Sequence, residues 1–211
     1  MESIGILQWC LEHLNYWTIA FLMTIESSAI PFPSEIVVPP AAYHAAATKE
    51  MSLALIIVFA TLGAFLGATI NYFLSMWLGR PIIYKFADSR LGHLLTLDKS
   101  KIQRAENYFN NHGNISTLIG RLIPVIRQLI SIPAGLSRMN FTRFALFTSI
   151  GAGIWNIVLA LLGYSLERVV PEDKLIETVT KYSHEIGYGI LAIVILSIIV
   201  IFIKKRAKRT Y

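Results

Sequence analysis

Long apolar runs dominate the pattern of hydrophobic and polar positions along this 211-residue chain. Residues 51–78, 141–164 and 188–203 are apolar almost throughout. A helix needs about 20 apolar residues to cross the hydrocarbon core of a bilayer, and the first two runs exceed that length. The third run is shorter but uninterrupted, and basic residues follow it directly. The pattern therefore predicts three transmembrane helices.

Two further apolar stretches, residues 14–47 and 115–136, are interrupted by proline. The prolines are Pro31, Pro33, Pro39 and Pro40 in the first stretch and Pro124 and Pro133 in the second. Proline removes a backbone donor and clashes with the preceding helical turn, so neither stretch forms one smooth helix. Broken backbone at membrane depth persists only where protein buries it or where it lines a cavity. We therefore predict two re-entrant hairpins.

The distribution of charge predicts how these segments are oriented. Five of the last eight residues are Lys or Arg, and such clusters mark the cytoplasmic side of a membrane protein. Residues 165–187 hold five acidic and three basic side chains, so we expect them outside. Residues 80–111 hold six basic and three acidic side chains, so we expect an amphipathic segment on the cytoplasmic surface. The first hairpin then enters from the outer face and the second from the cytoplasmic face.

The predicted elements form two similar halves within one all-α integral membrane domain. The predicted order is an interfacial segment (1–13), a first repeat (14–79), the cytoplasmic segment (80–111), a second repeat (112–164), an external loop (165–187) and a C-terminal transmembrane helix with its basic tail (188–211). In each repeat a proline-broken hairpin precedes a glycine-rich helix with one asparagine, Asn71 or Asn156. Inverted repeats of this kind are typical of transporters. The alternative is a coincidental placement of Gly and Pro in membrane helices.

Composition agrees with a membrane protein and narrows its partners. Only 15% of the residues are charged, whereas soluble domains average about 25%. The net charge of +6 is concentrated beside an apolar run, which favours anionic lipid headgroups over nucleic acid. Cys10 is the only cysteine, so no intrachain disulfide is possible, and we expect no metal or other cofactor. The N-terminus has no signal-peptide pattern. The sequence is compatible with a monomer or with a homo-oligomer.

Four charged residues fall inside the two broken segments. Glu26 and Glu35 lie on either side of the first proline break, and Arg121 and Arg127 lie on either side of Pro124. Each charge costs about 2.5–3.5 kcal/mol or more at the centre of a bilayer. Such residues therefore face one another, a cavity or a charged ligand. If the two hairpin tips meet, two carboxylates face two guanidinium groups.

Side-chain chemistry predicts a role for each pair. Arginine stays protonated, and its planar fork binds phosphate through parallel hydrogen bonds, so Arg121 and Arg127 are the predicted phosphate ligands. Burial favours the neutral form of a carboxyl group, so Glu26 and Glu35 are the predicted proton carriers, neutralising the arginines when no ligand is bound. The predicted supporting residues are Pro33, Pro124, Asn71 and Asn156. The alternative is a set of static salt bridges, although buried ion pairs are seldom the cheapest way to stabilise packing.

Two motifs carry a resemblance to a known family. The first is Glu26-Ser-Ser-Ala-Ile-Pro31-Phe-Pro33-Ser-Glu35. The second is Gly120-Arg121-Leu-Ile-Pro124-Val-Ile-Arg127, followed by Ile132-Pro133-Ala-Gly135. Over roughly residues 15–165 the chain resembles the DedA family, whose shared region is also called the VTT domain. Members commonly have Gly where this chain has Ser34, which is a small departure.

The resemblance implies lipid translocation across the bacterial cytoplasmic membrane, driven in some members by protons. It implies functional roles for Glu26, Glu35, Arg121 and Arg127, and it offers undecaprenyl phosphate or phosphatidylethanolamine as substrate. Headgroup chemistry favours undecaprenyl phosphate, because a monoester with up to two negative charges suits a pair of arginines.

Two other classes of function stay open from the sequence. An interfacial lipid phosphatase needs a nucleophile or an activated water beside a positioned base, and His112 is the one histidine near the second hairpin. A membrane-protein assembly factor would need only packed, charge-neutral hairpin tips. We predict a transporter rather than an enzyme.

Overall fold

The computed structural model describes residues 13–28, 34–79, 81–82, 85, 99–123 and 126–171, and then 174–175, 177–183, 185–186, 188–189 and 192. The elements are α2 (Tyr16–Glu26), η1 (Ser34–Ile36), α3 (Val38–Thr48), α4 (Leu53–Leu74), η2 (Ser75–Gly79), α7 (Lys99–Leu122), α8 (Ser131–Leu136) and α9 (Phe141–Leu166). These described ranges contain helices and turns and no strand. The prediction of an all-α protein is confirmed.

Helices α4 and α9 are long and apolar enough to cross a membrane. The stretch Leu53–Gly79 has 27 residues and Phe141–Leu166 has 26, so each is about 40 Å long against a hydrocarbon core of about 30 Å. Each helix exposes a stripe of large apolar side chains at every third or fourth position. The stripes are Leu55, Val58, Leu62, Leu66, Ile70 and Leu74 on α4, and Leu146, Ile150, Ile154, Ile157 and Leu161 on α9. Lipid is the solvent that suits such surfaces.

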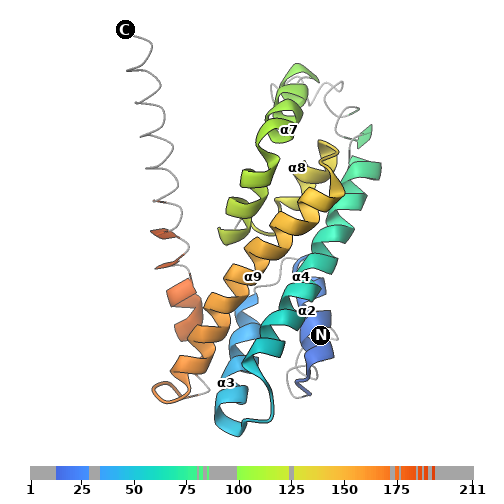
Figure 1. Ribbon diagram of the computed structural model, residues 1–211. Helices are drawn as coiled ribbons and strands as arrows, with labels where there is room; N and C mark the ends of the chain where they lie inside the picture. Colours follow the sequence, from blue (N-terminus) through green and yellow to red (C-terminus); the bar gives the residue numbers. More distant parts are fainter. Residues whose placement is uncertain are drawn as a thin grey trace.

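The remaining helices lie beside different halves of these two long helices. Figure 1 shows α2 and α3 beside the lower half of α4 and α9, and α7 and α8 beside the upper half. Helix α2 ends at Glu26 and α7 ends at Leu122, both near the middle of the long helices. Pro39 lies in the first turn of α3, where a missing backbone N–H is tolerated. The two broken segments thus approach the centre from opposite ends; Pro33 and Pro124 lie outside the described residues.

The helices pack in the same order in both halves. Helix α2 packs on α4 and α7 packs on α9, while α3 and α8 each pack on the long helix of the other half. Glycines allow these close approaches. A Cβ added at Gly67 would lie 2.3 Å from the carbonyl oxygen of Thr24, and one at Gly151 would lie 2.6 Å from Cβ of Arg121. The glycines therefore set the short distances at which α2 packs against α4 and α7 packs against α9.

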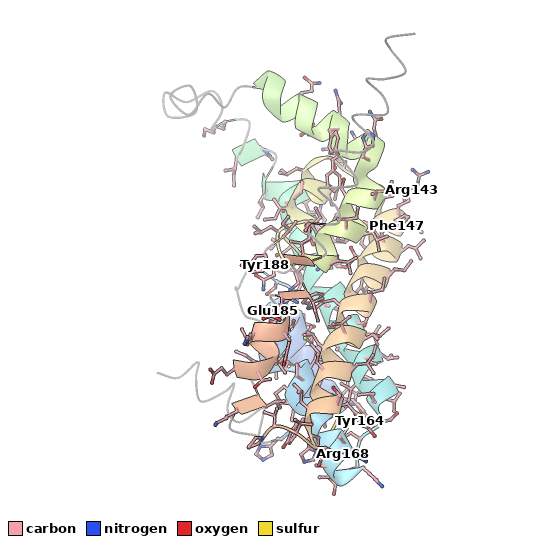
Figure 2. All side chains as sticks on the ribbon, turned by 90° about the vertical axis from the view of Figure 1, so that its left-hand side faces the viewer. Arg143, Phe147, Tyr164, Arg168, Glu185 and Tyr188 are labelled. Atoms are coloured by element: carbon pink, nitrogen blue, oxygen red, sulfur yellow. The ribbon has the colours of Figure 1, made fainter. Side chains whose placement is uncertain are left out.

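The region predicted as an external loop, residues 165–187, contains helix. Residues 177–183 are helical, and Leu175 and Val179 are buried in the same cluster as Leu159 of α9. Figure 2 shows Glu185 beside α9, between Arg143 at one end of that helix and Arg168 at the other. This segment therefore contains a packed helix, and its external location stays a prediction. Residues 1–12 and 193–211 lie outside the described residues, as do residues 86–98, so the predictions for those segments stay predictions.

Candidate functional site

Glu26 is the last residue of α2, and its carboxylate is buried, 2% exposed. Ser27 Oγ donates a hydrogen bond to Oε2 of Glu26 at 2.7 Å. Asn71 of α4 holds the same turn, because its Nδ2 donates to the carbonyl oxygen of Ser27 at 3.0 Å. A carboxylate at a helix C-terminus is opposed by the helix dipole. The hydrogen bond from Ser27 and the ion pair with Arg127 offset this unfavourable position.

Glu35 lies in η1, just before α3, and is 3% exposed. The start of a helix carries a partial positive charge that favours an acidic side chain. Ser34 beside it is also buried. Glu35 therefore has a favourable dipole where Glu26 has an unfavourable one, so the two carboxylates are not equivalent.

Arg121 lies in the last turn of α7, where the helix dipole favours a cation. The side chain is 3% exposed, and its Nη2 donates to Oγ of Ser131 at 2.7 Å. Ser131 is the first residue of α8, so this bond ties the two sides of the second broken segment together.

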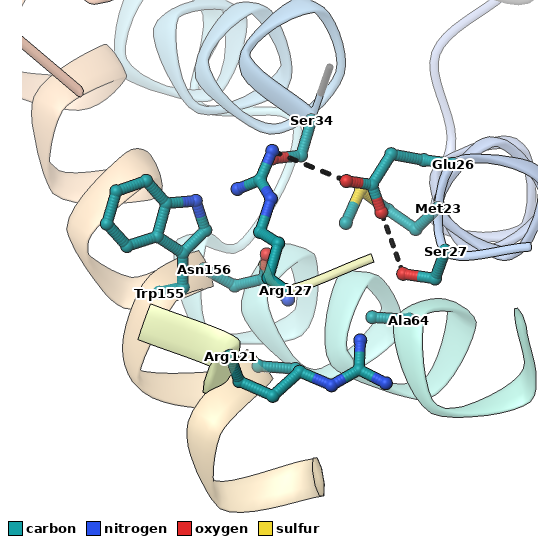
Figure 3. Close-up of a pocket in the computed structure, with 10 residues that line it drawn as sticks. Met23, Glu26, Ser27, Ser34, Ala64, Arg121, Arg127, Trp155 and Asn156 are labelled. Carbon is teal, nitrogen blue, oxygen red and sulfur yellow. Dashed lines mark hydrogen bonds and ion pairs between the residues drawn. The ribbon is translucent and has the colours of Figure 1, made fainter. Parts of the chain in front are cut away.

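Arg127 joins the two broken segments. Its Nη2 lies 3.3 Å from Oε1 of Glu26 and 3.2 Å from Oε2 of Glu35. Its Cζ lies 5.3 Å from the ring centroid of Trp155 on α9, within the range of a cation–π contact. Figure 3 shows the guanidinium group between the Trp155 ring and the Glu26 carboxylate. The structure thus brings Arg127 to both carboxylates, whereas the nearest partner of Arg121 is a serine.

A small cavity of about 20 Å³ lies among these side chains. That volume suffices for about one water molecule. The lining residues are Met23, Glu26, Ser27, Ser34, Ala64, Arg121, Arg127, Ala152, Trp155 and Asn156 (Figure 3). Asn156, predicted as a supporting residue, is one of them, and its Nδ2 donates to Oγ1 of Thr61 at 3.2 Å. The cavity therefore draws residues from both broken segments and from both long helices.

Several donors around the cavity are buried and have no hydrogen-bond partner among the described residues. They are Nε and Nη1 of Arg127, Nε of Arg121, Oγ of Ser34 and Nε1 of Trp155. Buried polar groups are nearly always paired, and an unpaired donor costs about 1–3 kcal/mol. Three of these donors are N–H groups of cations, and all of them suit an acceptor-rich anion.

Sequence reasoning missed Trp155, Ser34 and Ser131 as parts of the site. A signal existed for Trp155, because Ala152, Trp155, Asn156 and Leu159 share one face of a helix by their spacing, and all four are buried. An indole and an amide on the buried face of an apolar helix mark a polar interior. By contrast, His112 is exposed on α7 and its ring stacks on Tyr108 at 4.8 Å, away from the cavity lining.

A protein-family model described as the VTT domain matches residues 28–165, which include the whole of this site except Met23, Glu26 and Ser27. The chain belongs to the VTT-domain (DedA) family. Membership in this family together with the two apolar helices makes the chain a bacterial membrane protein. The resemblance in the two sequence motifs is thereby confirmed.

Three similar proteins carry either a phosphatase-like name or a transporter name. A protein of Lactococcus lactis subsp. lactis (strain IL1403) named "Alkaline phosphatase-like protein" is 35% identical over 93% of this chain and 90% of its own length. "Undecaprenyl phosphate transporter A" of Staphylococcus aureus (strain NCTC 8325 / PS 47) is 31% identical over 94% of this chain and 95% of its own length. The Bacillus subtilis (strain 168) protein of the same name is 33% identical over 76% of each chain. No solved structure gives a significant match.

Proposed function

We propose that this protein translocates undecaprenyl phosphate across the bacterial cytoplasmic membrane, with Arg127 and Arg121 binding the phosphate group. The observation that carries the proposal is the set of buried donors around the cavity without partners among the described residues. A phosphate monoester offers only acceptor atoms at neutral pH and carries up to two negative charges. Arginine binds such groups through more than one N–H at once, and Arg127 uses only its Nη2 for the two carboxylates.

The carboxylates of Glu26 and Glu35 stand in for the phosphate while no lipid is bound. They satisfy one nitrogen of Arg127, and the cavity beside them, at about 20 Å³, is far smaller than a phosphate group needs. Binding of the lipid therefore requires the two broken segments to separate at the Arg127 contacts. We further propose that these segments are re-entrant hairpins of an inverted repeat, because they approach the site from opposite ends of α4 and α9 (Figure 1). Alternating separation on each side would expose the site to one leaflet at a time.

Proton coupling follows from the same exchange of partners. When a phosphate takes over Arg127, Glu26 and Glu35 lose their cation while staying in a poorly hydrated site. An unpaired buried carboxylate is costly, and proton uptake removes that cost. Each binding event then draws protons into the site, and release of the lipid expels them as the ion pairs form again.

The choice of substrate rests on the relatives named for undecaprenyl phosphate transport and on headgroup charge. Phosphatidylethanolamine has one phosphate charge and an ammonium group. That single phosphate charge would balance only one of the two arginines, whereas a monoester with up to two negative charges can balance both Arg121 and Arg127. The site therefore suits a monoester without an amine better.

A phosphatase is the second candidate, and one contact favours it. The hydroxyl of Ser27 donates to the Glu26 carboxylate at 2.7 Å, which is the geometry of a nucleophile beside a base. The relatives named as alkaline phosphatase-like point the same way. Glu26 is, however, bound to Arg127 as well, which weakens it as a base.

Reconstitution into liposomes separates these functions. Purified protein is placed in vesicles that contain either undecaprenyl phosphate or phosphatidylethanolamine, each labelled so that its leaflet can be determined. We expect undecaprenyl phosphate to change leaflet intact, with no inorganic phosphate released. Release of phosphate would support the phosphatase, and movement of phosphatidylethanolamine alone would assign the other lipid. Protein-free vesicles and vesicles with the Arg127→Ala variant serve as controls.

A further inference from the structure

A second and larger cavity, of about 480 Å³, lies between the end of α4, η2 and the segment 126–132. We call it the η2 groove. Its lining residues are Ser28, Asn71, Leu74, Ser75, Leu78, Gly79, Ile82, Gln128, Leu129 and Ile132.

The groove has a polar floor and an apolar rim. Asn71 and Ser75 are buried, whereas Leu78 and Leu129 are 58% and 57% exposed. A lipid-facing surface that is only apolar needs no explanation in a membrane protein. A polar floor beneath an apolar rim suits a ligand whose polar end points inward and whose hydrocarbon part stays near the bilayer.

The floor of the groove adjoins the charged cavity. Gln128 lines the groove, and its Nε2 donates to Oε1 of Glu26 at 3.4 Å. Ser28 lines the groove while its neighbour Ser27 lines the cavity. Glu26 and Gln128 therefore link the groove to the cavity that holds the donors of Arg127. A lipid in the groove would therefore lie beside the Arg127 contacts at which the two broken segments separate.

The two halves of the protein differ at this place. In the first half, α3 has 11 residues and packs along α9, where a Cβ at Gly163 would lie 2.3 Å from the carbonyl oxygen of Pro39. In the second half, α8 has only 6 residues. The short α8 covers less of α4, and α4 continues into the π-helical turn η2, a feature often found at functional sites. The groove lies where α4 passes into η2, beside Ile132 of α8.

We propose that the η2 groove holds the hydrocarbon chain of the lipid phosphate while its headgroup enters the charged cavity, and that Gln128 is the gate between them. This inference rests on the proposed function, because it takes the lipid phosphate as the ligand. It adds the position of the chain and the side from which the lipid reaches the arginines. The first isoprene units lie against Leu129 and Leu78, and the phosphate passes Gln128 to Arg127.

Filling the groove tests the proposal. Leu129→Trp adds bulk at the rim, and Leu62→Trp adds the same bulk on the α4 stripe, where Leu62 is 50% exposed and outside the groove. The affinities of each variant for undecaprenyl phosphate and for methyl phosphate, which has no chain, are measured in detergent. We expect Leu129→Trp to weaken binding of undecaprenyl phosphate at least about tenfold, the effect of excluding two or more methylene groups. Methyl phosphate should bind as before, and Leu62→Trp should change neither affinity.

Three results would overturn the inference in different ways. If Leu129→Trp binds undecaprenyl phosphate as the wild type does, the groove does not hold the chain. If it loses both ligands by the same factor, the substitution acts on the headgroup site and the groove is not a separate chain site. If the wild-type protein binds neither ligand, the proposed function itself fails.

Protection from a thiol reagent gives a second measurement that does not depend on the bulky variant folding. In a Cys10→Ser background, Leu129→Cys and Leu62→Cys are each treated with a membrane-soluble maleimide. We expect undecaprenyl phosphate to slow labelling at position 129 and to leave labelling at position 62 unchanged. Equal labelling rates with and without the lipid at position 129 would contradict the proposal.

Discussion

Nη2 of Arg127 lies 3.3 Å from Oε1 of Glu26, and the same nitrogen lies 3.2 Å from Oε2 of Glu35. One nitrogen of a five-donor group thus holds two carboxylates from the first broken segment, while Nε and Nη1 have no partner among the described residues. The ion pairs of Nη2 close the site, and Nε and Nη1 of Arg127 stay available to bind a ligand. A purely structural salt bridge would be expected to use the arginine fork more fully.

Removal of Arg127 should destabilise the protein through the carboxylates that it leaves behind. Loss of one partner of a buried ion pair costs about 3–5 kcal/mol, so we expect Arg127→Ala to lower the unfolding temperature in detergent. Adding Glu26→Gln and Glu35→Gln should restore most of the loss, because no buried charge is then unpaired. Arg143, exposed on α9, provides the control Arg143→Ala. Wild-type stability of Arg127→Ala would show that the ion pairs do not hold the segments together.

Trp155 should contribute a hydrogen bond to the ligand in addition to its packing. Phenylalanine at this position keeps a ring beside the Arg127 guanidinium but removes the indole N–H. We expect Trp155→Phe to bind undecaprenyl phosphate about tenfold more weakly, because a hydrogen bond to a charged group contributes about 1.5–3 kcal/mol. The unfolding temperature should fall only by the cost of the cavity that the smaller ring leaves, since that N–H has no partner among the described residues without ligand. Trp17, 76% exposed, supplies the control Trp17→Phe; unchanged affinity of Trp155→Phe would remove Trp155 from the ligand set.

Two glycines on one helix give a matched test of how α7 is positioned. A Cβ at Gly151 would lie 2.6 Å from Cβ of Arg121, whereas a Cβ at Gly153 would lie 3.8 Å from the nearest side-chain atoms, those of Thr61. We expect Gly151→Ala to displace α7 with Arg121 and to cost about 1–3 kcal/mol of stability, as overpacking does. Gly153→Ala should behave as the wild type in both stability and transport. Equal effects of the two substitutions would mean that the Gly151 contact does not set the position of Arg121.

The carboxylates should carry the dependence of transport on pH. With Glu26→Gln and Glu35→Gln together, no proton can be taken up when phosphate displaces them from Arg127. We expect this double variant to bind undecaprenyl phosphate at least as tightly as the wild type, because it lacks the competing charges. In liposomes its transport should no longer respond to an imposed pH gradient. A response equal to that of the wild type would show that Glu26 and Glu35 do not couple transport to protons.

Much of the fold follows from the sequence because membranes impose simple rules. The uninterrupted apolar runs gave α4 and α9, and prolines marked segments that could not be single helices. The helix at residues 177–183 was missed because its charged composition suggested a loop. Leu175, Val179 and Ser183 are spaced four residues apart and are all buried, so a helical period was present in the sequence.

The site was only partly predictable. The cost of burying charge singled out all four charged residues, Glu26, Glu35, Arg121 and Arg127, from the sequence alone. The two arginines look alike in sequence, yet one contacts carboxylates and the other contacts Ser131. That difference, like the position of Trp155 beside Arg127, depends on which helix faces meet in three dimensions, and spacing along the chain does not determine it.

Equilibrium binding can test whether the lipid phosphate binds Arg127 in exchange for the two carboxylates. The affinity of purified protein for undecaprenyl phosphate is measured for the wild type, for Arg127→Ala combined with Glu26→Gln and Glu35→Gln, and for the Glu26→Gln and Glu35→Gln pair alone. We expect the Glu26→Gln and Glu35→Gln pair alone to bind at least as tightly as the wild type. Removing Arg127 from that background should weaken binding about 100-fold or more, as expected for a buried charge-assisted contact. Equal affinity with and without Arg127 would contradict it.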